Sequence, residues 1–194
     1  LEFRRVLFRS CSTLSGGYSN IASGGFSTVA GGVNNCATCG AAFVGGGYLN
    51  TASNYQATVS GGYKVCATAL RATAVGGECN AASGTWSFIG GGFSNTASGA
   101  YSKVGGGRNN NANSTSSAIG GGGYNSALAT YATIAGGGGN TASGYAATAA
   151  GGQSNTASGT RSTIAGGHGS TASGACSFVG GGCGHNASGN WATI

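Results

Sequence analysis

Residues 91–105 read GGFSNTASGAYSKVG, and the rest of the chain repeats this pattern. A Gly-Gly pair recurs every fifteen residues, from Gly16-Gly17 to Gly181-Gly182, in twelve units without an insertion or deletion. Numbered from the first glycine of each pair, position 7 is always Ala, position 12 is Ser or Ala, and position 14 is Val or Ile in ten units. Position 5 is Asn in nine units, and Val65, Ser170 and His185 replace it in the others. A fixed period of this kind indicates a stacked repeat architecture.

Each unit predicts two short extended segments joined by two turns. Positions 5–8 form the first segment, and positions 11–15, rich in Thr and β-branched residues, form the second. Gly-Gly at positions 1 and 2 predicts a bend with positive φ, and position 9 marks the other bend. Strand alternation directs positions 12 and 14 inward with the Ala of position 7, while Asn at position 5 predicts an internal amide ladder. We therefore expect an all-β fold, a parallel β-solenoid of twelve 15-residue rungs.

The first ten residues, LEFRRVLFRS, lie outside the repeat. Residues Arg4 to Ser10 match the in-frame translation of a common sequencing adapter, so we expect 1–10 to be a non-native segment. The alternative is a short amphipathic strand that caps the first rung. The repeat domain is expected to span 11–194. Because the chain contains no Met and stops at Ile194 inside an unfinished unit, we expect it to be part of a longer reading frame.

Composition argues against several classes of protein. Gly does not recur at every third residue as collagen requires, and the chain has no Asp for the calcium sites of Gly-rich rolls. With one Glu and two His in the repeats, general acid–base catalysis lacks its groups, so we expect neither an enzyme nor a cofactor. The basic residues are scattered too thinly for nucleic acid. No apolar run reaches the roughly 18 residues of a membrane helix.

The seven cysteines do not predict disulfides, because no two in adjacent repeats share a position. Cys36 and Cys66 share position 6, but they lie two rungs apart, about 10 Å at the usual strand spacing. The single Cys36-x-x-Cys39 motif is weak evidence for zinc. His168, Cys183 and His185 lie on consecutive rungs and offer three possible ligands at most, so we expect no metal site.

The predicted core is thin, since one Val or Ile, one Ala and one Ser or Ala must order fifteen residues per rung. Association along the rod would bury more apolar surface, so we expect a parallel homotrimer that buries the position-14 side chains and the aromatic faces between chains. The aromatic candidates occupy positions 3, 10, 11 and 13. They are Tyr18, Tyr48, Tyr63, Phe93, Tyr55, Tyr145, Phe26, Trp86, Tyr101, Tyr131, Trp191, Phe43, Phe88 and Phe178.

The unit Asn95-Thr-Ala-Ser-Gly-Ala-Tyr-Ser-Lys-Val-Gly-Gly resembles the head repeats of trimeric autotransporter adhesins, the YadA-like head. In that family, repeats with a Ser-x-Ile/Val-Gly core motif form a left-handed parallel β-roll with three chains side by side. The resemblance covers Cys11 to Ile194, although the best-known heads repeat at about fourteen residues rather than fifteen. It implies a bacterial protein, either anchored to the outer membrane and displayed at the cell surface or secreted. Such a homotrimer would mediate attachment to a host, matrix or cell-surface ligand.

Two other structural functions remain open. Similar repeats occur in phage tail-fibre shafts. Thr-x-Ser at positions 6 and 8 and Thr at position 13 also resemble the arrays of ice-binding β-solenoids. Because the outward positions vary without forming a cluster, the sequence singles out no ligand-binding residues.

Overall fold

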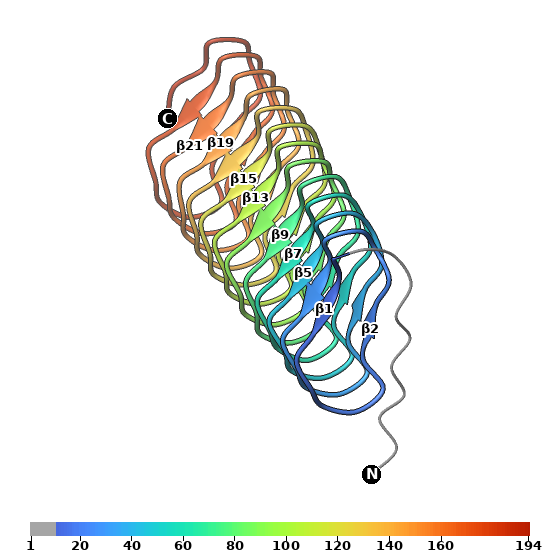
Figure 1. Cartoon of the computed structure of the whole chain (residues 1–194). Helices are drawn as coiled ribbons and strands as arrows, with labels where there is room; N and C mark the ends of the chain where they lie inside the picture. Colours follow the sequence, from blue (N-terminus) through green and yellow to red (C-terminus); the bar gives the residue numbers. More distant parts are fainter. Residues whose placement is uncertain (1–10) are drawn as a thin grey trace.

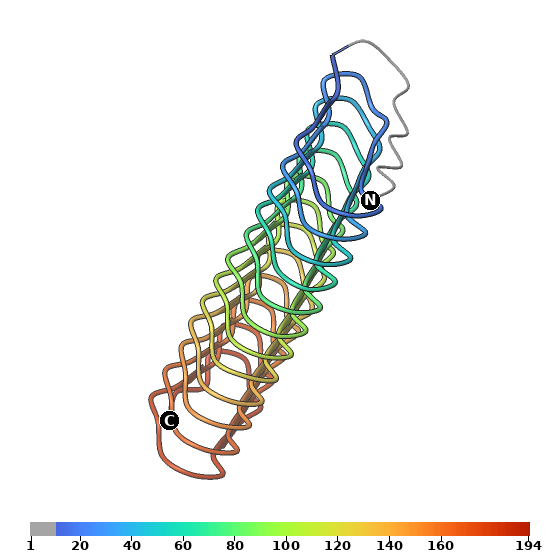
Figure 2. The same cartoon turned by 60° about the horizontal axis from the view of Figure 1, so that its bottom comes forward.

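The computed structural model describes residues 11–194, so the non-native segment expected at 1–10 lies outside the described residues. Residues 11–194 form an all-β parallel β-solenoid without helices, as the repeat predicts. Successive turns stack into an elongated rod, with the first and last rungs at opposite ends (Figures 1 and 2).

Two twelve-stranded parallel sheets run along the rod, each built from strands of two residues. The first sheet uses positions 6 and 7. Its strands are β2 (Ile21–Ala22), β4 (Cys36–Ala37), β6 (Thr51–Ala52), β8 (Cys66–Ala67), β10 (Ala81–Ala82), β12 (Thr96–Ala97), β14 (Asn111–Ala112), β16 (Ser126–Ala127), β18 (Thr141–Ala142), β20 (Thr156–Ala157), β22 (Thr171–Ala172) and β24 (Asn186–Ala187).

The second sheet uses positions 13 and 14. Its strands are β1 (Thr13–Leu14), β3 (Thr28–Val29), β5 (Phe43–Val44), β7 (Thr58–Val59), β9 (Thr73–Ala74), β11 (Phe88–Ile89), β13 (Lys103–Val104), β15 (Ala118–Ile119), β17 (Thr133–Ile134), β19 (Thr148–Ala149), β21 (Thr163–Ile164) and β23 (Phe178–Val179).

Every strand pairs with the strand fifteen residues further on, so equivalent positions lie side by side. Ala97, for example, pairs with Ala112. A third line of parallel bridges, at position 3, runs from Tyr18 to Cys183. The sequence prediction missed this line, because a single bridging residue per rung leaves no alternation pattern to detect. A fourth line joins the N–H of position 11 to the position-10 carbonyl of the preceding rung, as from Arg71 to Tyr55 at 2.9 Å, so neighbouring rungs meet along four lines of backbone contact.

Two positions of each rung adopt left-handed backbone, and one of them, position 11, thereby lies outside the second strand predicted at positions 11–15. Position 11 has positive φ in every rung, as at Phe26 (φ 60°) and Trp86 (φ 60°), and position 4 behaves alike. Position 11 is the third residue of a β-turn that the N–H of Ser27 closes on the carbonyl of Gly24, at 3.0 Å in the first rung. A turn with positive φ at this place normally selects Gly. Here the stacking imposes the conformation on other residues.

Replacing Ala146 with Gly should therefore stabilise the protein by up to about 1 kcal/mol, since Ala146 holds a φ of 50° that disfavours a Cβ. The same change at Ala100, in position 10 and outside the positive-φ set, should destabilise by roughly 0.5–1 kcal/mol. Thermal denaturation of the two variants checks the sign. A lower melting temperature for both would contradict the strain at position 11.

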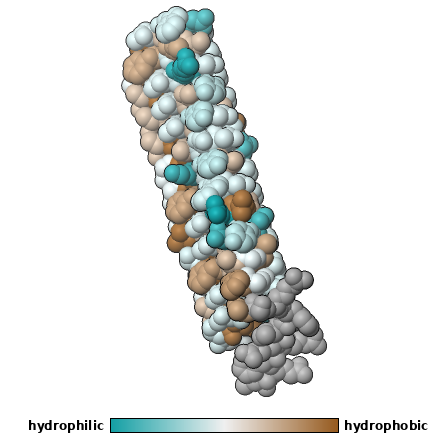
Figure 3. Space-filling view, turned by 45° about the horizontal axis from the view of Figure 1, so that its top comes forward, coloured by the Kyte–Doolittle hydropathy of each residue, from teal (hydrophilic) through white to brown (hydrophobic). Residues whose placement is uncertain are grey.

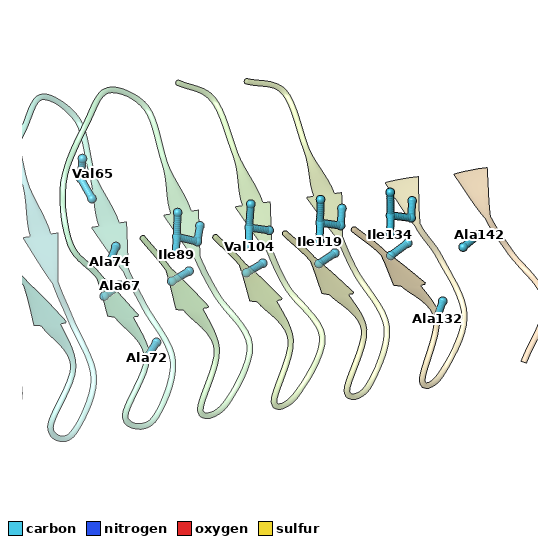
Figure 4. Close-up of a cluster of buried hydrophobic side chains, with 14 of the residues drawn as sticks. Val65, Ala67, Ala72, Ala74, Ile89, Val104, Ile119, Ala132, Ile134 and Ala142 are labelled. Carbon is cyan, nitrogen blue, oxygen red and sulfur yellow. The ribbon is translucent and has the colours of Figure 1, made fainter. Parts of the chain in front are cut away.

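The inward set predicted from the sequence is confirmed. Ala at position 7 is buried in all twelve rungs, and position 12 is buried in every rung except the last, where Ala192 is half-buried. Position 14 is also buried, except for Ile194 at the end of the chain. Figure 4 shows these side chains in a column between the two sheets. The expectation that position 14 packs between chains was wrong, because each chain encloses these side chains itself.

The Asn residues at position 5 form a buried ladder along the rod. Nδ2 of Asn95 donates to the carbonyls of Gly91 (3.0 Å) and Gly107 (2.8 Å), and Oδ1 accepts the N–H of Asn110 (3.0 Å). The predicted internal ladder exists, but each amide bonds to backbone groups rather than to the next amide. Asn fits because it offers two donors and one acceptor on a short side chain.

Val65 interrupts this ladder, and replacing it with Asn should stabilise the protein by about 1–2 kcal/mol. Val65 is fully buried and accepts nothing from the N–H of Asn80, whereas Asn50 accepts the N–H of Val65 at 2.9 Å. Asn at 65 would complete the ladder. Urea denaturation measures the change. The matched control is Val59→Asn, which places an amide in the apolar column at position 14 and should destabilise. A loss of stability in both variants would contradict the proposed role of the ladder.

Candidate functional surfaces

Because side chains fill the interior, the side chains available for binding lie on the outside of the rod. Two stacks of turn residues are defined here as columns. The 3/4 column consists of positions 3 and 4 of each rung, from 18–19 to 183–184. The 10/11 column consists of positions 10 and 11, from 25–26 to 190–191. Between them, positions 6 and 8 face outward from one sheet, and positions 13 and 15 from the other.

The 3/4 column carries aromatic and basic side chains in its N-terminal two thirds. The rings of Tyr48 and Tyr63 stack with centroids 5.6 Å apart, and Nζ of Lys64 lies 5.0 Å from the Tyr63 ring. Further along, the guanidinium of Arg108 lies 5.0 Å from the ring of Tyr124. The only carboxylate side chain of residues 11–194, Glu78, also belongs to this column.

The 10/11 column holds a continuous run of four large side chains at position 11. Nε of Arg71 donates to Oε1 of Gln56 at 2.7 Å, and the Arg71 guanidinium lies 4.5 Å from the Trp86 ring. Tyr101 follows on the next rung. A separate aromatic pair, Tyr131 and Tyr145, meets edge to face at 5.7 Å. Within this run, Arg71 contacts both Gln56 and Trp86.

The three Phe residues at position 13 lie over their own strands. A Cβ on Gly45 would stand 3.4 Å from Cε1 of Phe43, and the same relation joins Gly90 to Phe88 at 3.5 Å. The third pair, Phe178 and Gly180, repeats it at 3.4 Å. Each ring therefore covers a glycine two residues further on. The sequence holds the signal, since every Phe at position 13 is followed by Gly at position 15.

In-register pairing also places Thr side chains next to one another in the C-terminal rungs. Thr133, Thr148 and Thr163 pair in succession on one sheet. On the other sheet, Thr141, Thr156 and Thr171 do the same. Phe178 and Asn186 end these rows.

The residues considered for metal binding come together only in part. Nδ1 of His168 lies 3.7 Å from Sγ of Cys183, and both side chains are exposed. His185 is exposed as well, and its backbone N–H donates to Oγ of Ser170 at 3.2 Å. Within residues 11–194, no three His, Cys, Asp or Glu side chains are grouped closely enough to hold a metal ion.

All seven cysteines, which lie within the described part of the chain, are free thiols. Cys36 and Cys39 are both half-buried. Burial raises the pKa of the Cys36 thiol, and burial together with the charge of Cys79 raises the pKa of Cys66. Both thiols therefore stay protonated at neutral pH, which makes them weak nucleophiles and poor metal ligands.

Positive charge predominates on the described surface. Residues 11–194 carry five Lys and Arg residues, all exposed, against one Glu. Figure 3, coloured by hydropathy, shows a face of mostly intermediate hydropathy on which apolar side chains are scattered rather than gathered into one patch. In residues 11–194, no helix is long and apolar enough to span a bilayer.

Compared with models of protein families and with curated proteins, the chain matches none.

Proposed function

We propose that this chain is a non-catalytic adhesive rod, displayed on a bacterial surface as part of the head or shaft of a trimeric adhesin. The observation that carries the proposal is that each rung keeps its inward positions nearly constant and varies its outward positions. Inward position 5 is Asn in nine rungs, and positions 7, 12 and 14 hold only Ala, Ser, Val or Ile, while the outward positions change from rung to rung. A solenoid of this kind presents variable side chains along an extended surface without altering its core.

The small number of potentially catalytic side chains in the repeats also favours a structural role. Hydrolytic or redox chemistry would need carboxylates, histidines or activated thiols held together. The repeats carry one Glu and two His, and burial keeps Cys36 and Cys66 protonated. What the rod offers instead is length and a large exposed area of aromatic and hydroxyl side chains.

A homotrimer is the proposed working form. Large aromatic side chains remain exposed on both columns, among them Tyr18 (65%), Phe26 (70%) and Trp191 (76%). Burying these rings between chains would remove apolar surface from water, which favours association. Since position 14 is already enclosed within each chain, contacts between chains would use these aromatic side chains.

Light scattering on the purified chain tests the trimer, combined with melting at several protein concentrations. An assembled form should melt at higher temperature as concentration rises, because association stabilises the folded state by mass action. A folded monomer whose melting is independent of concentration would rule out the trimer.

The adhesive role is tested by displaying the chain on a non-adherent bacterium and counting cells that remain on matrix-coated wells and on host cells after washing. The control strain displays an unrelated solenoid of equal length. Retention no greater than that of the control would refute an adhesive function.

Ice binding is a second candidate, favoured by the adjacent Thr side chains at 133, 148 and 163 and at 141, 156 and 171. Regular hydroxyl and methyl groups on a flat β-face can order water. Thermal hysteresis of the purified chain, compared with a Thr148→Lys variant, tests this function. An absence of hysteresis in the unmodified chain would exclude it.

A further inference from the structure

One part of the 10/11 column is organised as a binding surface. The Arg71 cluster is defined here as Tyr55, Gln56, Arg71, Trp86 and Tyr101. Position 11 of four consecutive rungs supplies four of these residues, and Tyr55 occupies position 10 of the first of them. The parallel register therefore stacks their side chains along the rod axis, about 4.8 Å per rung.

Arg71 is held in a fixed orientation by its neighbours. Its Nε–H donates to Oε1 of Gln56 at 2.7 Å, and its guanidinium lies over the Trp86 ring, 4.5 Å from the centroid. The backbone N–H of Arg71 donates to the carbonyl of Tyr55 at 2.9 Å, which fixes the turn that carries the side chain. Within residues 11–194, the two Nη groups have no hydrogen-bond partner. A guanidinium oriented in this way presents two parallel donors to an oxyanion at a small entropic cost.

The aromatic members place ring surfaces beside this cation. Trp86 is 45% exposed, Tyr101 55% and Tyr55 48%. Exposed aromatic rings on a rigid β-scaffold are suited to the C–H faces of pyranose sugars, which pack against them without requiring one fixed register. One cation followed by two rings along a line suits a polymer whose sugar rings carry charged groups.

The positive charge of the 10/11 column favours an anionic partner. Its two basic residues, Arg71 and Arg161, are exposed, and positions 10 and 11 hold no acidic residue in any rung. The single carboxylate of the repeats, Glu78, belongs to the 3/4 column. Nothing on the 10/11 column therefore neutralises Arg71, and uncompensated positive charge attracts anions.

We propose that the Arg71 cluster binds an anionic polysaccharide. The Arg71 guanidinium contacts a sulfate or carboxylate group, and Trp86 and Tyr101 pack on the adjoining sugar rings. The inference rests on the proposed adhesive function and names the class of its ligand.

The test uses the full chain carrying Trp191→Phe, so that Trp86 is the only fluorescent indole. Dextran sulfate supplies sulfate groups, hyaluronan supplies carboxylates, and uncharged dextran of matched length is the neutral control. We expect Trp86 fluorescence to change on addition of at least one anionic polymer and to stay constant with dextran. The responding polymer identifies the anionic group. Constant fluorescence with both anionic polymers would overturn the proposal.

Variants in the same background separate a site from diffuse attraction, with binding to the responding polymer measured by calorimetry. Arg71→Gln and Trp86→Ala should each weaken binding about tenfold or more. Arg161→Gln is the matched control, because it removes one exposed charge from position 11 six rungs away, where the adjacent rungs hold Ala146 and Cys176 at position 11 in place of Gln56 and Trp86. It should weaken binding less than about twofold. Circular dichroism confirms that each variant folds. Equal losses for Arg71→Gln and Arg161→Gln would reduce the effect to overall charge and refute the site.

Two further polymers distinguish sugar recognition from other anions. Polyglutamate carries charge without sugar rings, and single-stranded oligothymidylate carries charge with stacking bases. If either binds as tightly as the polysaccharide with the same dependence on Trp86, the assignment to polysaccharide is wrong. If neither anionic polysaccharide binds while the displayed chain still retains cells, this inference falls and the adhesive function stands. If a polysaccharide binds but cells are not retained, the adhesive function falls instead.

Discussion

Replacing Gly152 with Ala is expected to destabilise the protein by roughly 2–5 kcal/mol, through left-handed strain combined with overpacking. Gly152 occupies position 2 with a φ of 81°, and a Cβ there would lie 2.1 Å from the carbonyl oxygen of Gly167. That oxygen is backbone in the next rung, so it cannot move aside without disturbing the stack. Urea denaturation of the full chain measures the loss.

The adjacent glycine provides the control. A Cβ on Gly151 would meet no atom within 4 Å, and its φ lies outside the left-handed range, so Gly151→Ala should change stability by less than about 1 kcal/mol. Similar losses for the two variants would show that close approach of the rungs is not what selects Gly at position 2. At position 1, Gly46 and Gly91 hold a φ of 144°, a conformation that disfavours a side chain, whereas Gly151 does not.

Replacing Asn110 with Asp is the second change with a large expected effect, several kcal/mol at neutral pH. Asn110 is buried, and its Nδ2 donates to the carbonyls of Gly106 (2.9 Å) and Gly122 (3.0 Å). An ionised carboxylate has no donor for these oxygens and would place negative charge against them in a site closed to water.

The loss should depend on pH in a definite direction. Burial beside two carbonyls would raise the pKa of the new carboxyl above its unfolded value of about 3.9. The folded state then holds the proton more tightly, so the variant is least destabilised below about pH 4 and loses stability as pH rises through the folded-state pKa. Denaturation between pH 3 and 8 measures this.

The matched control for this substitution is Asn109→Asp. Asn109 is half-buried at position 4, with a φ of 53° that Asp also tolerates. This variant should stay within about 0.5 kcal/mol of the unmodified chain. If Asn110→Asp shows the same small change, or no pH dependence, the ladder does not contribute as described.

Much of the fold could be predicted because the same residue types recur at the same positions of each fifteen-residue unit. Invariant Ala at position 7 and Val or Ile at position 14 fix the interior and the register. The left-handed positions could not be predicted, since Lys64 and Trp86 adopt a conformation that their own propensities oppose. That conformation comes from contacts with adjacent rungs, which local sequence does not encode.

The Arg71 cluster was missed for a different reason. No single residue type marks position 11, because Gln56, Arg71 and Trp86 differ in type and contact one another across rungs. The fifteen-residue register nevertheless places them at the same position of successive units, so the sequence itself puts them in line. Only the orientation of the Arg71 side chain could not be inferred from the sequence.

The backbone hydrogen bonds between rungs run along the length of the rod, as where the N–H of Phe93 donates to the carbonyl of Gly107 at 2.9 Å. Tension applied to the two ends therefore acts on these bonds one rung at a time, from the end inward. Each rung that peels away releases fifteen residues, about 50 Å of extended chain, in exchange for about 5 Å of rod. Since the rungs have equal lengths, the rod can lengthen under load in even increments while its remaining turns stay folded. For a tether exposed to flow, such yielding limits the peak force that reaches the point of attachment.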